Sequence, residues 1–130
     1  MPGRVYPRLK ETDQGFEPER GAIVYAYGVV WLRYTEFCPK FEAQVLGKQL
    51  LRSGTSVGAN YREAHRGRSK AEFIAKCGDS FRELEESAYW LELLVDGEIV
   101  AAAKLLPLLT ECDELTAIFV TIIKRAKDTS

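Results

Sequence analysis

Histidine, methionine and cysteine are scarce in this 130-residue chain, which has one His, one Met and three Cys. The three cysteines are an odd number without a close pair, which suggests neither a disulfide framework nor a cysteine-type zinc site. A di-iron site in a helical bundle needs Glu-x-x-His pairs from two helices, and the single His65 cannot supply them. We therefore expect no metal and no cofactor. The cysteines are Cys38, Cys77 and Cys112.

Long hydrophobic runs are also missing. The longest, such as Leu105 to Leu109 and Ala117 to Val120, are far shorter than the roughly 20 apolar residues of a membrane span. Met1 to Lys10 lacks the apolar core of a signal peptide. We expect a cytoplasmic protein without a membrane segment, and its length allows one domain with a real core.

The spacing of apolar residues predicts an all-α fold, and short connections predict that it is one antiparallel four-helix bundle over residues 21–130. Prolines and glycines in residues 1–20 predict an irregular N-terminal arm. The first expected helix begins near Phe16 or Ala22 and ends near Phe37, the second and third span about 41–66 and 69–95, and the fourth carries apolar seams over 105–123. In the last of these, Pro107 should either kink the helix or mark its true start after a short helical piece.

Local signals fix the ends of the third helix and its neighbour. Gly67 is a plausible C-terminal cap, Ser69 with Glu72 forms a capping box, and Asp96-Gly97 is a stop. The short connection predicts that the second and third helices are antiparallel neighbours. The fourth helix has two apolar seams, one of which needs a further partner. The seam of the third helix is Ile74, Cys77, Phe81, Leu84, Ala88, Leu91 and Val95.

A stripe of mostly small polar residues runs beside the apolar face of the second helix. It consists of Gln49, Ser53, Ser56, Asn60 and Glu63. We favour a hydrogen-bonded network that fixes helix register or subunit packing, and a ligand or nucleic-acid contact surface is the alternative. Gly54 and Gly58 in the same helix predict that a neighbouring helix approaches closely.

Charges are sorted along the chain although the net charge is only −1. Residues 46–78 contain seven bases and two acids, and residues 79–98 contain one base and seven acids. The cluster Arg62, Arg66, Arg68 and Lys70 has the composition of a phosphate-binding patch. Its alternative is a solvated helix end whose cations complement the helix dipole.

An enzyme is not expected. The carboxylate pairs Glu83 with Glu86 and Glu111 with Glu114 are interpreted as surface or interface charges. His65 lies among arginines and is interpreted as solvated or phosphate-facing. No nucleophile has a credible general base, so no catalytic residue is assigned.

Three strings carry a resemblance to a known family: QLLRSGTSVGANYREA (49–64), SKAEFIAK (69–76) and ESAYWLELL (86–94). They resemble the signature of four-helix-bundle proteins first noticed as products of intervening sequences inside bacterial 23S ribosomal RNA genes. The resemblance implies an up-down-up-down four-helix bundle, a homopentamer, similarity to the accessory proteins of diversity-generating retroelements, and a nucleic-acid role with RNA or DNA as a partner. It implies no established activity. A structural oligomer that binds a protein partner through its acidic third helix is the rival hypothesis.

Overall fold

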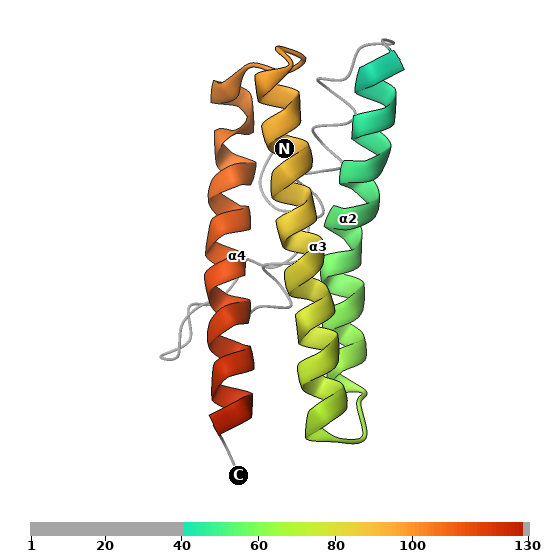
Figure 1. The fold of residues 1–130 in the computed structure, drawn as a ribbon, viewed down its shortest axis with the longest axis vertical. Coiled ribbons are helices and arrows are strands. Elements are labelled where there is room, and N and C mark those ends of the chain that lie inside the picture. Colours follow the sequence, from blue (N-terminus) through green and yellow to red (C-terminus); the bar gives the residue numbers. More distant parts are fainter. Residues whose placement is uncertain (1–40, 129–130) are drawn as a thin grey trace, which may run out of the picture.

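The structure, a computed structural model, describes residues 41–128. Three long antiparallel helices make up most of this part of the chain (Figure 1). They are α2 (Phe41–His65), α3 (Lys70–Asp96) and α4 (Ala102–Asp128). Residues 41–128 contain no strand, which confirms the all-helical class. The predicted arm at residues 1–20, the predicted helix at 22–37 and Cys38 lie outside the described residues.

The connection between α2 and α3 is short because both helix ends are held by local contacts. The Ser69 hydroxyl accepts a hydrogen bond from the Glu72 backbone N–H at 3.1 Å, so the predicted capping role of Ser69 is confirmed. The Glu72 carboxylate accepts from the Arg68 backbone N–H at 2.7 Å. A side chain at position 67 would crowd the turn, because an added Cβ would lie 3.1 Å from the Ala64 carbonyl oxygen, and Gly67 avoids this contact. The chain therefore reverses within four residues.

The second connection follows α3, which ends at Asp96 as expected. The Gly97 backbone N–H donates to the Leu93 carbonyl at 2.8 Å. Helix α4 then runs without interruption through Pro107. The alternative in which Pro107 marks the start of the helix is therefore wrong. Pro107 is exposed, and burial of the neighbouring Leu105 and Leu108 offsets its one missing backbone hydrogen bond.

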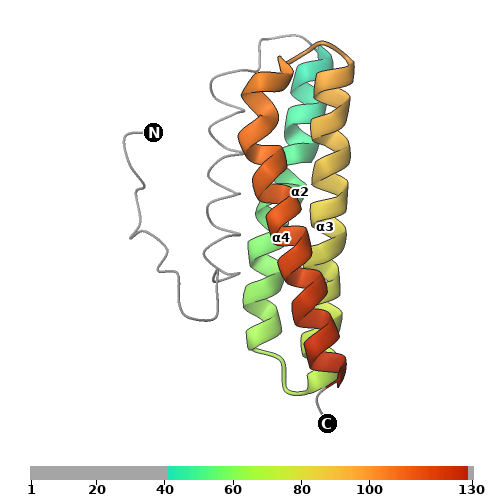
Figure 2. The same cartoon turned by 90° about the vertical axis from the view of Figure 1, so that its left-hand side faces the viewer.

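Helix α3 lies between α2 and α4 and contributes the central line of the core (Figures 1 and 2). Cys77, Leu84 and Leu91 of its predicted seam are fully buried, as expected. The other four seam positions are only partly buried. The fully buried line is instead completed by Ser80, Ser87 and Leu94. The predicted seam was therefore rotated slightly away from the true packing face.

Small residues explain why Ser80 and Ser87 lie on the buried face of α3, because they let α2 and α3 pack closely. The Ser87 hydroxyl donates to the Ser53 hydroxyl at 2.8 Å, and the Ser80 hydroxyl donates to the Val57 carbonyl at 2.8 Å. Gly54 is buried on the same face of α2. Each buried hydroxyl thus has a partner, which avoids the cost of an unsatisfied polar group.

Helix α4 closes the core from the other side. Its buried positions combine members of both predicted seams in one line: Leu105, Leu108, Cys112, Leu115 and Phe119. The Phe119 ring meets Tyr61 of α2 edge to face, with centroids 5.2 Å apart. None of the described helices has the length and apolar character needed to cross a membrane.

Candidate nucleic-acid interface

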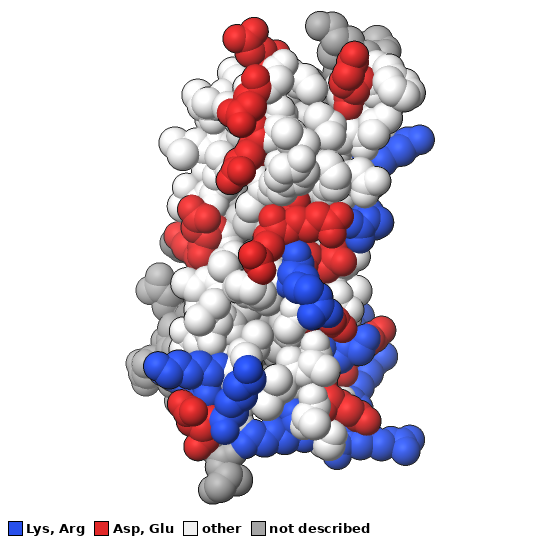
Figure 3. All heavy atoms as spheres, in the orientation of Figure 1, with Lys and Arg blue, Asp and Glu red and all other residues white. Residues whose placement is uncertain are grey.

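Positive charge gathers at one end of the three helices. The turn between α2 and α3 and the C-terminal end of α4 lie at the same end in both ribbon views (Figures 1 and 2). Figure 3 shows most of the lysine and arginine side chains toward that end, with some carboxylates among them, and mainly carboxylates toward the other end. We call seven cations there the basic end: Arg62, Arg66, Arg68, Lys70, Lys124, Arg125 and Lys127.

Two arginines along the middle of the helices are already paired with carboxylates. Arg52 binds Glu83 and Glu86 of α3, and these contacts raise the pKa of its guanidinium. Arg82 pairs with Asp79. In contrast, five of the seven cations of the basic end form no ion pair within the described residues. These five are Arg66, Arg68, Lys70, Lys124 and Lys127.

Two carboxylates near the basic end are occupied by other contacts. Glu63 forms an ion pair with Lys76 at 2.8 Å, and the hydrogen bond from this ammonium lowers the pKa of Glu63. Glu72 caps the turn by accepting the Arg68 backbone N–H. The positive charge of Arg66 also lowers the pKa of Glu63, without an ion pair between them. Arg66, Arg68, Lys70, Lys124 and Lys127 form no ion pair within residues 41–128, so these five cations can bind an anion.

The helix dipole explains only some of these cations. Arg62 lies in the last turn of α2, and Arg125 and Lys127 in that of α4, where positive charge is favourable. Arg68 and Lys70, however, flank the N-cap of α3, where the helix end is itself partly positive. Cations at this position do not stabilise the helix. The solvated-helix-end interpretation therefore does not account for Arg68 and Lys70.

His65 packs on aromatic rings at the edge of the basic end. Its ring centroid lies 4.6 Å from that of Tyr61 and 5.7 Å from that of Phe73, both in edge-on geometry. The residue is exposed overall. Within residues 41–128, no group of three or more His, Cys, Asp or Glu side chains is arranged to hold a metal.

The predicted polar stripe of α2 divides into two kinds of contact. Ser53 is buried against Ser87, and Glu63 is exposed and paired with Lys76, so both join α2 to α3. Gln49 accepts from Arg52, and Ser56 donates to the Arg52 carbonyl, both within α2. Asn60 is half-buried. The stripe therefore does not form one continuous contact surface.

The carboxylates weighed as a catalytic pair have a structural use. Glu83 and Glu86 of α3 both bind Arg52 of α2. The Trp90 indole N–H also donates to Glu86, at 3.3 Å. The contacts with Arg52 join two helices on the protein surface, and the Trp90 hydrogen bond lies within α3.

Sequence reasoning missed the contribution of α4 to the basic end. Lys124, Arg125 and Lys127 are far from Arg66 in sequence but lie at the same end of the fold. The signal was available, because three antiparallel helices of similar length place the end of the third beside the turn that joins the first two.

Comparisons with known proteins agree with this architecture. The family model for 23S rRNA-intervening sequence protein matches residues 26–121. A crystal structure from Bacteroides thetaiotaomicron, described as a protein with unknown function from the S23 ribosomal protein family, superposes with a TM-score of 0.77. It shares 34% sequence identity, and the match covers 83% of this chain and 99% of that chain. No curated protein matches the chain.

Proposed function

The chain belongs to the 23S rRNA-intervening sequence protein family, and from this premise we propose that it is a non-catalytic protein that binds or scaffolds RNA or DNA through its basic end. Phosphate groups are the ligand class, because exposed arginine and lysine side chains recognise them without a built pocket. Such binding is electrostatic and tolerant of sequence. As a nucleic-acid binder the protein would act in the cytoplasm.

One observation carries the proposal most directly. Arg68 and Lys70 lie at the N-terminal end of α3 without an ion pair in the described structure, although the helix dipole disfavours cations there. A helix N-terminus with exposed backbone N–H groups and neighbouring cations attracts phosphate. The two cations are unfavourable for the helix in the isolated protein, and they would bind phosphate in a complex with a polyanion.

We also propose that residues 22–37 complete a four-helix bundle and that the bundles assemble, with a homopentamer as the expected state. Exposed apolar side chains on the described helices support an assembly, since Phe41 is 78% exposed and Val45, one turn further along α2, is 42% exposed. A pentamer would present five copies of the basic end, and their simultaneous contacts would strengthen weak individual ones.

A structural oligomer that binds a protein partner through acidic α3 is the second candidate. The sorting of acids onto α3 favours it. However, three of the seven acids in residues 79–98 already form ion pairs within the chain, namely Asp79, Glu83 and Glu86. Five of the seven cations of the basic end form no ion pair within residues 41–128, and for this reason nucleic-acid binding is the leading proposal.

The test compares two double charge reversals that change the net charge equally. Arg66→Glu with Arg68→Glu acts on the basic end, and Lys48→Glu with Arg82→Glu acts on exposed cations elsewhere. Anisotropy of a labelled oligonucleotide should show that the parent loses affinity as salt rises. The first variant should reduce the log-log salt slope by about 1.4 to 1.8, because each phosphate contact contributes about 0.7 to 0.9.

The control variant should keep most of that slope. Circular dichroism must show parental helicity for both variants, so that a loss of binding is not a loss of folding. Equal losses of affinity in the two variants would show that net charge, and not the basic end, determines binding. Absence of binding by the parent at low salt would reject the proposal and favour the protein-partner candidate.

A further inference from the structure

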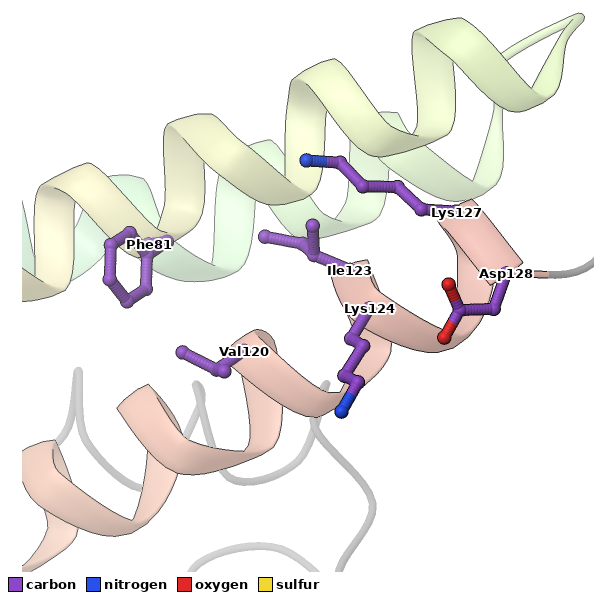
Figure 4. A pocket seen from close by; sticks show the side chains of 6 residues that line it. All are labelled: Phe81, Val120, Ile123, Lys124, Lys127 and Asp128. Atoms are coloured by element: carbon purple, nitrogen blue, oxygen red, sulfur yellow. The ribbon is translucent and has the colours of Figure 1, made fainter.

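An apolar hollow of about 370 Å³ lies between α3 and α4 near the basic end. Its walls are Phe81 of α3 and Val120 and Ile123 of α4, and its rim carries Lys124, Lys127 and Asp128. Figure 4 shows the three apolar side chains converging on the space between the two helices, with the Lys127 side chain extending along α3 above Ile123. The hollow thus combines an aromatic wall with nearby positive charge.

These features favour an occupant that is flat, apolar on its faces and attached to a negative group. Phe81 is only half-buried, so part of its ring is accessible, and Val120 is 48% exposed. Lys124 and Lys127 have no carboxylate partner within ion-pair distance in residues 41–128. Asp128 opposes an anion at the rim, but the two lysines outnumber it.

We propose that the hollow holds one unpaired base of a single strand of RNA or DNA, stacked against Phe81, with a flanking phosphate on Lys124 or Lys127. The inference rests on the proposed function and adds a preference for unpaired over paired strands. Aromatic side chains bind bases of any sequence by stacking, but a base within a duplex is not accessible for it.

The position of the hollow connects it to the turn between α2 and α3. Phe81 follows Lys70 by eleven residues on the same helix, which corresponds to about 16 Å along α3. A strand whose phosphates contact the turn can therefore reach the hollow within a few nucleotides. This separation matches the short strand lengths that single-strand binding folds occupy, from about 4 to 16 nucleotides.

The experiment measures affinity for a fluorescein-labelled single strand and for the matching duplex, each prepared as RNA and as DNA. The parent should bind the single strand more tightly in both chemistries. Phe81→Leu keeps an apolar side chain but removes the ring, and should weaken single-strand binding by about 5-fold or more while duplex binding stays unchanged. Phe81→Tyr retains a ring and should preserve the parental preference.

Tyr89→Leu is the matched control, since it removes an exposed ring from the same helix outside the hollow. It should leave single-strand affinity unchanged. Phe81 packs partly against the core, so thermal unfolding must accompany each variant, and Lys124→Gln with Lys127→Gln gives a second route that leaves the core intact. This pair should also weaken single-strand binding more than duplex binding.

The possible failures are distinguishable. If the parent binds neither strand form, the proposed function and this inference both fall. If the parent binds but prefers the duplex, or if Phe81→Leu binds the single strand as the parent does, only the base-binding hollow is overturned. A preference for RNA alone or DNA alone would identify the natural chemistry of the strand.

Discussion

Replacement of Leu84 by alanine tests whether α3 lies at the centre of the core. Leu84 is 0% exposed and lies midway along α3, the helix between α2 and α4 (Figure 1). Its carbonyl also accepts the Cys112 S–H at 3.4 Å, so the backbone there is tied to α4. Because helices on both sides restrict collapse into the cavity, we expect a loss of about 3 to 4 kcal/mol of unfolding free energy.

Leu106→Ala is the matched control on α4. Leu106 is 61% exposed among the described residues, and leucine and alanine have similar helix propensities. Its replacement should change stability by less than about 0.5 kcal/mol. Urea denaturation followed by circular dichroism measures both variants, at one protein concentration because assembly would contribute to apparent stability.

In thermal unfolding, the Leu84→Ala variant should melt about 12 to 16 °C below the parent, given roughly 4 °C per kcal/mol for a chain of this size. A loss below about 1 kcal/mol would place Leu84 outside the core. Equal losses for Leu84→Ala and Leu106→Ala would show that burial in the described helices does not determine their stability.

Two further predictions concern buried polar and thiol groups. A double-mutant cycle with Ser53→Ala and Ser87→Ala should give a coupling energy of about 1 kcal/mol in urea denaturation, because their hydroxyls share a 2.8 Å hydrogen bond, and zero coupling would contradict that contact. Burial raises the pKa of the Cys77 thiol from 9.0 to about 11, so the unfolded chain loses this proton first and stability should decline as pH rises from 9 to 11. The Cys77→Ala variant should show a shallower decline of stability over this pH range, and a pH profile of stability identical to that of the parent would reject this role of the thiol.

The fold was largely predictable from local signals. The cap at Ser69 and the stop at Asp96-Gly97 depend on residues within one helical turn, and the structure confirms both. Helix α2 also continues through its glycines, as the apolar period predicted. The continuity of α4 through Pro107 was not predictable, because it depends on burial of the residues around Pro107 and not on local propensity.

The candidate site was only partly predictable. The cluster from Arg62 to Lys70 was evident as a charge pattern, but the pattern could not show which cations lack partners. Arg52 belongs to the same basic segment and yet binds Glu83 and Glu86 on the adjacent helix. Such pairing depends on how two helices are rotated and aligned along their axes, which charge spacing in one segment does not specify.

The sequence by itself determined the helices, their ends and their antiparallel order, because periodicity, caps and short turns act over a few residues. Only the tertiary structure decided the rotation of α3 that buries Ser80 and Ser87 instead of Phe81. It also brought Lys124 and Lys127 beside Phe81 and made the hollow between them. These features require side chains distant in sequence to pack together, and the close approach that small residues allow between α2 and α3 sets which faces remain accessible.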